Sequence, residues 1–147
     1  MGADLYIKNM DKQYTGFEIS DRAVNLGYFR DCYNDYGLFN FLRSNISNKD
    51  YSWWEIIEKK KLFDSNHDMS VKGAKVFLKS MTDAKDIINR IPPENLKLKI
   101  FDSSIKGKPV YKLLSIKDGK EFKAWLGLLI EFLKLAIRLK SPIIFSV

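Results

Sequence analysis

One segment constrains the fold of this chain more than any other: residues 71–91 carry an apolar residue at almost every third or fourth position. That spacing is the period of an α-helix with one buried face. Ser70 precedes the segment and is a favourable N-cap, and Pro92-Pro93 ends it because proline cannot continue a helix. The pattern predicts a long helix whose buried stripe is Ala74, Phe77, Leu78, Met81, Ala84, Ile88 and Ile91.

A second long helix is predicted between the Asp118-Gly119 turn and Pro142. It is apolar apart from one narrow stripe, formed by Lys123, Gly127, Glu131, Lys134 and Arg138. These charges interrupt the uncharged run that a membrane-spanning helix needs. We therefore expect a core helix with one solvent-exposed edge and no membrane association.

Two shorter helices are also expected. One follows Asn34, a favourable cap, and places Leu38, Phe39 and Leu42 on one face. The other opens on the capping box Ser52-Trp53-Trp54-Glu55 and ends near Phe63. With the two long helices, this predicts a helix-dominated α+β fold of about four helices around an aromatic core.

The remaining patterns predict strands. Residues 95–101 alternate apolar side chains with lysine, which is typical of a half-buried strand, and 109–116 is a candidate partner in a hairpin spanning 96–116. Residues 3–8 and 143–147 read as terminal strands, and we expect them to pair because an apolar C-terminal run is unfavourable in water. Residues 14–20 fit a strand or a loop.

Composition indicates one intracellular domain spanning residues 1–147. The chain is 46% hydrophobic and 14% aromatic, enough apolar surface for a single core without disulfides. Cys32 is the only cysteine, which fits a reducing compartment. The first residues lack the basic and apolar regions of a signal peptide. We therefore expect a cytoplasmic location.

Positive charge is concentrated in the second half of the chain. The net charge is +7, and eight lysines lie between positions 97 and 123. Such a region, including Lys97, Lys99, Lys106 and Lys108, would attract a phosphate backbone or an acidic protein surface. The segment has no arginine, the usual reader of bases and phosphates, and a lysine-, isoleucine- and asparagine-rich composition also follows from an A/T-rich genome.

The segment from Gly27 to Asn34 is the densest in chemically informative side chains. Were it helical, Arg30 and Asn34 would share a face. Aromatic walls with a convergent arginine, aspartate and asparagine suit a small polar ligand or a peptide, whereas the alternative is core packing with an internal ion pair. The candidate binding residues are Tyr28, Arg30, Asp31, Tyr33 and Asn34.

The adjacent pair Trp53 and Trp54 is a second candidate contact surface. Neighbouring positions on a helix cannot both face one core, so we expect one indole to be buried and the other partly exposed at an interface.

No catalytic or metal-binding constellation is predicted. Residues 64–70 place oxygen-bearing side chains at alternate positions, as a calcium loop does, but Met69 and Lys75 stand where that loop needs glycine and glutamate. The simpler interpretation is a polar loop that ends in the Ser70 cap. His67 is expected on the surface and Cys32 in the core. We expect no cofactor and favour a protein that is not an enzyme.

Four pieces of the sequence, in order, resemble an uncharacterised family of small bacterial and bacteriophage proteins. They are the start MGADLYI, the segment GYFRDCYN, the pair Trp53-Trp54 and the end SPIIFSV. The resemblance implies no activity, cofactor or catalytic residue, and residues 95–120 match the family least.

The leading functional hypothesis is a binding or regulatory protein of a bacterium or phage that acts through protein contacts. Nucleic-acid binding through the lysine-rich 97–123 region is one alternative. A small enzyme or ligand-binding domain centred on Tyr28–Asn34 is another. The partner is unknown, and the sequence leaves a homo-oligomer open.

Overall fold

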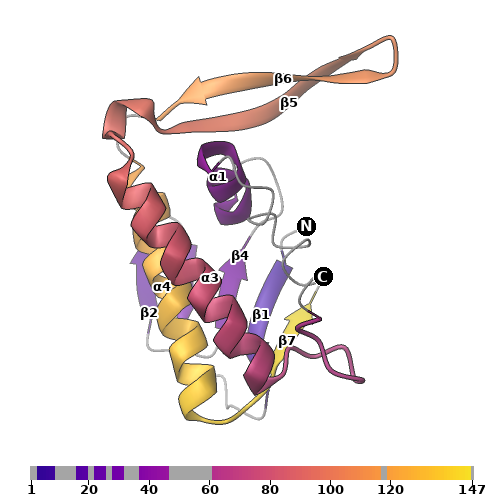
Figure 1. The fold of residues 1–147 in the computed structure, drawn as a ribbon, viewed down its shortest axis with the longest axis vertical. Coiled ribbons are helices and arrows are strands. Elements are labelled where there is room, and N and C mark those ends of the chain that lie inside the picture. The colour runs from indigo at the N-terminus through magenta and orange to yellow at the C-terminus, as the bar shows by residue number, and fades with distance from the viewer. Residues whose placement is uncertain are drawn as a thin grey trace.

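The computed structural model describes residues 3–8, 16–19, 22–25, 28–31, 37–46, 61–116 and 119–146, which form an α+β fold (Figure 1). The helices are α1 (Leu38–Asn45), α3 (Val71–Arg90) and α4 (Lys120–Arg138), with a 3₁₀ turn at Pro93–Asn95. The strands are β1 (Ala3–Ile7), β2 (Gly16–Ile19), β3 (Arg22–Asn25), β4 (Tyr28–Asp31), β5 (Lys97–Ile105), β6 (Lys108–Ser115) and β7 (Ile143–Ser146).

Helix α3 confirms the prediction made from its periodicity. The Ser70 hydroxyl accepts a hydrogen bond from the Gly73 N–H at 3.0 Å, which satisfies one of the free donors of the first turn. The predicted stripe is buried at Ala74, Phe77, Met81, Ala84 and Ile88. Leu78 and Ile91 are half-buried at its edge.

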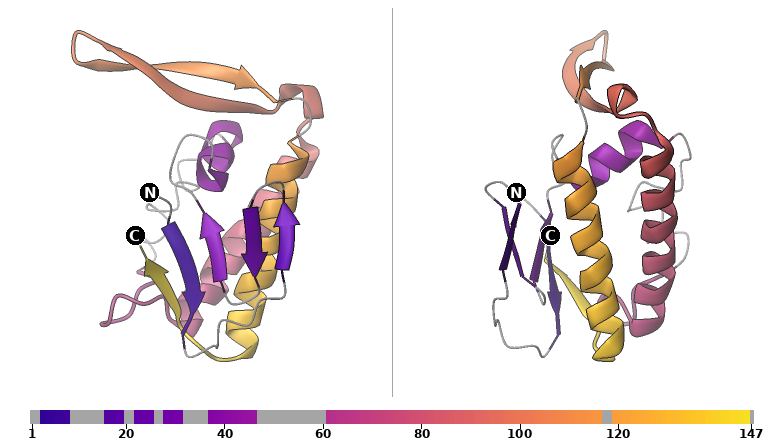
Figure 2. Two further views of the ribbon diagram at one scale, coloured as in Figure 1. Left: turned by 180° about the vertical axis from the view of Figure 1, so that it is seen from behind. Right: turned by 90° about the vertical axis from the view of Figure 1, so that its left-hand side faces the viewer.

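Helix α4 is the middle layer of the molecule. In the right-hand view of Figure 2 it lies between the five-stranded sheet and α3, so it is covered on two sides. Its buried residues include Trp125, Leu129, Phe132 and Leu133. The predicted polar stripe is exposed at Glu131, Lys134 and Arg138. A core helix with one solvent-exposed edge is therefore confirmed. Among the described helices none is long and apolar enough to cross a membrane.

The larger sheet has the strand order β2-β3-β4-β1-β7. Strands β1 and β7 pair antiparallel, with Leu5 opposite Phe145 and Ile7 opposite Ile143. The predicted pairing of the two terminal strands is thus confirmed. The sheet is wider than predicted because β2, β3 and β4 extend it, and residues 16–19 are strand rather than loop. Both long helices lie on one side of this sheet (Figure 2).

Two expectations are corrected, and the conformation of residues 28–31, which the sequence left open, is established. Four helices are not supported, because the described residues form three α-helices, and residues 52–60 of the fourth predicted helix lie outside them. Helix α1 begins at Leu38 after Gly37, whose backbone is extended, and not near Asn34. Residues 28–31 form strand β4, since they pair with β1 in an antiparallel ladder. The i, i+4 relation of a helix therefore does not apply to Arg30.

Candidate binding surface on the hairpin

Strands β5 and β6 form the second sheet, a hairpin that crosses the end of the molecule near α1 and extends past it at its turn (Figure 1). Lys106 and Gly107 form its two-residue turn with positive φ angles of 51° and 76°. Positive φ at both positions matches the right-handed twist of the paired strands and is typical of tight hairpins. The ladder runs from Ile105 opposite Lys108 to Lys97 opposite Ser115. The predicted hairpin is confirmed.

The two faces of the hairpin differ. On the inner face Leu98 is buried, and its neighbours Ile100 and Leu114 are half-buried against the core. On the outer face Lys97 and Lys99 are exposed, and Leu113 is opposite Lys99. The Lys99 ammonium lies 4.5 Å from the centre of the Tyr111 ring, a cation–π contact.

The hairpin exposes three large apolar side chains: Tyr111 and Leu113 on the outer face, and Ile105 beside the turn. Ile105 is 61% exposed, Leu113 60% and Tyr111 42%. All five lysines of the two strands and their turn are exposed as well, and Asp102 is the only acidic residue among them. The hairpin therefore carries a formal charge of +4 together with accessible apolar area. We call this surface, formed by residues 97–115, the hairpin arm.

Helix α1 holds the hairpin arm by one edge. The Asn45 side chain accepts a hydrogen bond from the Lys97 N–H at 2.9 Å and donates one to the Lys97 carbonyl at 2.8 Å. The Ser44 hydroxyl accepts from the Lys99 N–H at 2.9 Å, and Asn40 donates to the Lys99 carbonyl at 3.0 Å. Three polar side chains thus take the place of a third strand along the base of β5.

Replacing Asn45 with alanine tests this attachment. The Lys97 N–H and carbonyl lose both partners, so we expect exchange of the Lys97 amide hydrogen to accelerate by at least about tenfold and the free energy of unfolding to fall by about 1–2 kcal/mol. Hydrogen exchange followed by NMR measures the first effect. Asn89→Ala, at an exposed position of α3, is the control. Unchanged exchange at Lys97 would contradict the role of Asn45.

The other predicted site residues are only partly visible. The backbone of Tyr28, Arg30 and Asp31 lies in β4, where Arg30 is opposite Asp4. Tyr33, Asn34, Cys32 and the pair Trp53 and Trp54 lie outside the described residues. A binding site at Tyr28–Asn34 or at Trp53 and Trp54 therefore stays a prediction.

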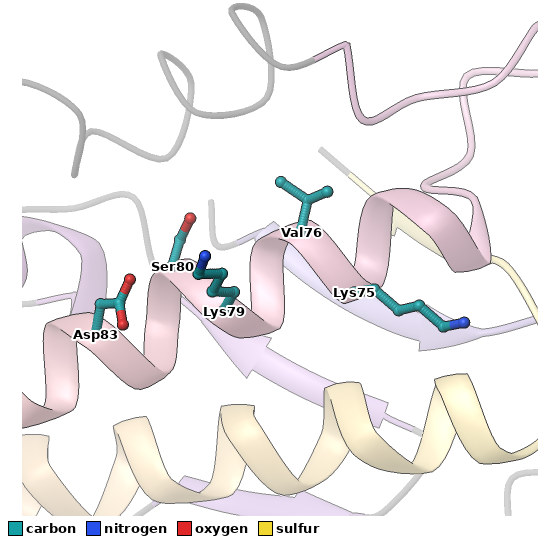
Figure 3. Close-up of a pocket in the computed structure, with 5 residues that line it drawn as sticks. All are labelled: Lys75, Val76, Lys79, Ser80 and Asp83. Carbon is teal, nitrogen blue, oxygen red and sulfur yellow. The ribbon is translucent and has the colours of Figure 1, made fainter.

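A hollow on α3 is a weaker candidate. It has a volume of about 560 Å³ and is lined by Lys75, Val76, Lys79, Ser80 and Asp83 (Figure 3). That volume is in the range of small-molecule sites. However, all five residues come from one helix, and they include neither histidine nor cysteine.

The 64–70 loop is a capped polar turn, as predicted. One Asp64 carboxylate oxygen accepts hydrogen bonds from the N–H groups of Asn66 and Asp68. The Lys8 ammonium lies 3.1 Å from the Asp68 carboxylate, and His67 is exposed. Within the described ranges no group of three or more histidine, cysteine, aspartate or glutamate side chains is placed to hold a metal ion.

Comparison of the chain with protein-family models, with curated protein sequences and with solved structures gave no match. The functional argument therefore rests on the chain's own surface.

Proposed function

We propose that this chain is a non-enzymatic binding protein that contacts a partner protein through the hairpin arm. The observation that carries the proposal is the exposure of Ile105, Tyr111 and Leu113 on a hairpin that extends past the rest of the fold at its turn (Figure 1). Tyr111 and Leu113 lie two residues apart on the outer face, and Ile105 lies beside the turn. Exposed apolar side chains that lie close together commonly mark a contact surface. The surrounding lysines favour a partner with an acidic rim.

Nucleic-acid binding by the same arm is the second candidate. It is favoured by the exposure of Lys97, Lys99, Lys106 and Lys108 on a two-stranded ribbon, an element that can enter the major groove. It leaves the exposed Leu113 and Ile105 without a role, because phosphate contacts do not require aliphatic side chains. We therefore place a protein partner first.

Neutralising the arm separates binding from folding. We expect the combined variant Lys97→Gln, Lys99→Gln, Lys106→Gln and Lys108→Gln to capture its partner from an extract of the source cells at least about tenfold less well. The reason is the loss of long-range attraction to an acidic surface, and quantified capture at several salt concentrations measures it. Thermal unfolding should be nearly unchanged, since the four side chains are exposed.

The matched control neutralises four exposed lysines at the opposite end of the helical layers: Lys72, Lys75, Lys134 and Lys140. We expect the control to capture as the unmodified chain does. Failure to capture a stoichiometric protein at any salt concentration would count against the proposal. Tight binding of a short DNA duplex, with an affinity that falls steeply as salt rises, would favour the second candidate.

A further inference from the structure

The two long edges of the hairpin arm are not equivalent. The N–H and carbonyl groups of Lys97 and Lys99 point to α1, where Asn40, Ser44 and Asn45 bind them. The base of the β5 edge is therefore closed by this chain itself.

The register shows that the β6 edge faces away from β5 and is unpaired among the described residues. Backbone groups of successive residues in an antiparallel strand point alternately to its two edges. The Ile116 N–H donates to the Leu96 carbonyl, which makes that pair a bonded one. The pairs Lys97–Ser115 and Lys99–Leu113 therefore turn their N–H and carbonyl groups outward. No strand among the described residues pairs with this side of β6.

Proline limits the length of that edge. Pro109 has no N–H to offer, so the N–H groups that this edge offers to a further strand lie beyond it, at Leu113 and Ser115. Along it the side chains alternate: the aromatic Tyr111 and the aliphatic Leu113 are on the outer face, while Lys112 is on the inner face. A strand added to β6 would place its own side chains beside these residues.

We propose that the edge of β6 at Leu113 and Ser115 binds an extended segment of the partner protein in which acidic and apolar residues alternate. The apolar side chains pack beside Leu113, and an acidic side chain faces Lys112. This inference rests on the proposed function and names the binding mode of the same arm. Strand addition supplies main-chain hydrogen bonds for affinity, and the alternating neighbours supply selectivity.

The net charge of the arm distinguishes this occupant from a second copy of the chain. Two hairpin arms that paired through β6 would each bring a formal charge of +4 to the new sheet, with their Lys112 side chains on neighbouring strands. Like charges at that distance are unfavourable. An acidic segment instead neutralises the arm.

The probe is a short, end-capped peptide in which glutamate and valine alternate, added to the isotope-labelled full chain. We expect a saturating amount to slow exchange of the Leu113 and Ser115 amide hydrogens by at least about tenfold. The Ile116 amide, already bonded to Leu96, should change little. The same peptide with lysine in place of glutamate should not bind.

Two variants of the chain test the main-chain contact. Leu113→Pro and Leu113→Ala both remove the leucine side chain, but only proline removes the outward N–H. We expect Leu113→Pro to lose at least about tenfold more affinity for the acidic peptide than Leu113→Ala. If circular dichroism shows that Leu113→Pro is misfolded, N-methylation of the peptide backbone provides the same test on the unmodified chain and should abolish binding.

Several outcomes would overturn this inference. The acidic peptide could fail to bind up to its solubility limit, or the basic peptide could bind equally well. The Leu113→Pro and Leu113→Ala variants could also lose the same affinity for the acidic peptide. Light scattering that shows a dimer with protected Leu113 and Ser115 amides in the absence of peptide would identify a second copy as the occupant. A DNA duplex that binds more tightly without protecting these amides would identify nucleic acid. Protein capture that requires the arm lysines but survives Leu113→Pro would remove only the inference and leave the proposed function intact.

Discussion

Gly73→Ala is expected to lower the free energy of unfolding by about 3 kcal/mol, as measured by urea denaturation. An alanine Cβ at this position would clash with the backbone carbonyl oxygen of Leu62. That carbonyl accepts a hydrogen bond from the Ser70 N–H, and the Ser70 hydroxyl in turn caps Gly73. The clashing Leu62 carbonyl is a backbone group, and the hydrogen bond from Ser70 holds it in place. The clash can therefore be removed only if the first turn of α3 moves away from the segment that precedes it.

Gly127→Ala is the matched control for that experiment. Gly127 lies within α4, and an added Cβ would meet no atom within 4 Å. Alanine loses less backbone entropy than glycine in a helix, so the free energy of unfolding should rise by about 0.5–1 kcal/mol. The two substitutions should thus change the free energy of unfolding in opposite directions. Equal effects would mean that the close approach of Gly73 to Leu62 does not exist in solution.

Local signals explain which elements the sequence could predict. The periodicity and Ser70 cap of α3, the alternation of Leu98 and Ile100 with lysine, and the apolar run at the C-terminus all depend on neighbouring residues. For α1 the prediction was correct about the buried face, with Leu38, Phe39 and Leu42 all buried. Its start was misplaced, because the backbone of Gly37 is extended and the helix begins only after it.

Long-range contacts explain what the sequence could not predict. The bonds that attach Asn45 to Lys97 span 52 residues of chain. Nothing in the local sequence pattern indicates that the Asn45 side chain binds the edge of a strand, because it could equally be an ordinary exposed residue near a helix end. The widening of the sheet by β2, β3 and β4 is likewise a matter of pairing between strands with weak individual patterns.

The candidate surface was predictable in composition but not in shape. The lysine-rich region and its hairpin follow from residues 97–116, and so does the interpretation as a charged contact surface. Helix α1 binds the β5 edge, whereas no described strand pairs with the β6 edge, and this difference depends on which side of the hairpin the helix occupies. The alternating signal of a strand carries no information on which of its edges is covered.

Phe41→Ala should also destabilise the chain strongly, because Phe41 packs α1, the helix that holds the hairpin arm, against the core. Its ring is fully buried and stacks on Phe122 of α4 with centroids 4.5 Å apart and planes 7° from parallel. Truncation of a buried phenylalanine leaves a cavity, so we expect the free energy of unfolding to fall by about 3–5 kcal/mol. Urea denaturation measures this loss.

The same variant should also loosen the arm. Phe41 lies between Asn40 and the Ser44–Asn45 pair that binds the backbone of β5, so a displaced α1 cannot keep those bonds. Amide exchange at Lys97 and Lys99 should accelerate more than the fall in global stability explains. The control is Arg43→Ala, at an exposed position of α1, which should change neither these exchange rates nor the free energy of unfolding appreciably. If exchange at these amides rose only in step with global unfolding, α1 would support the core without orienting the arm, and the closed edge of β5 would depend on its own side-chain bonds alone.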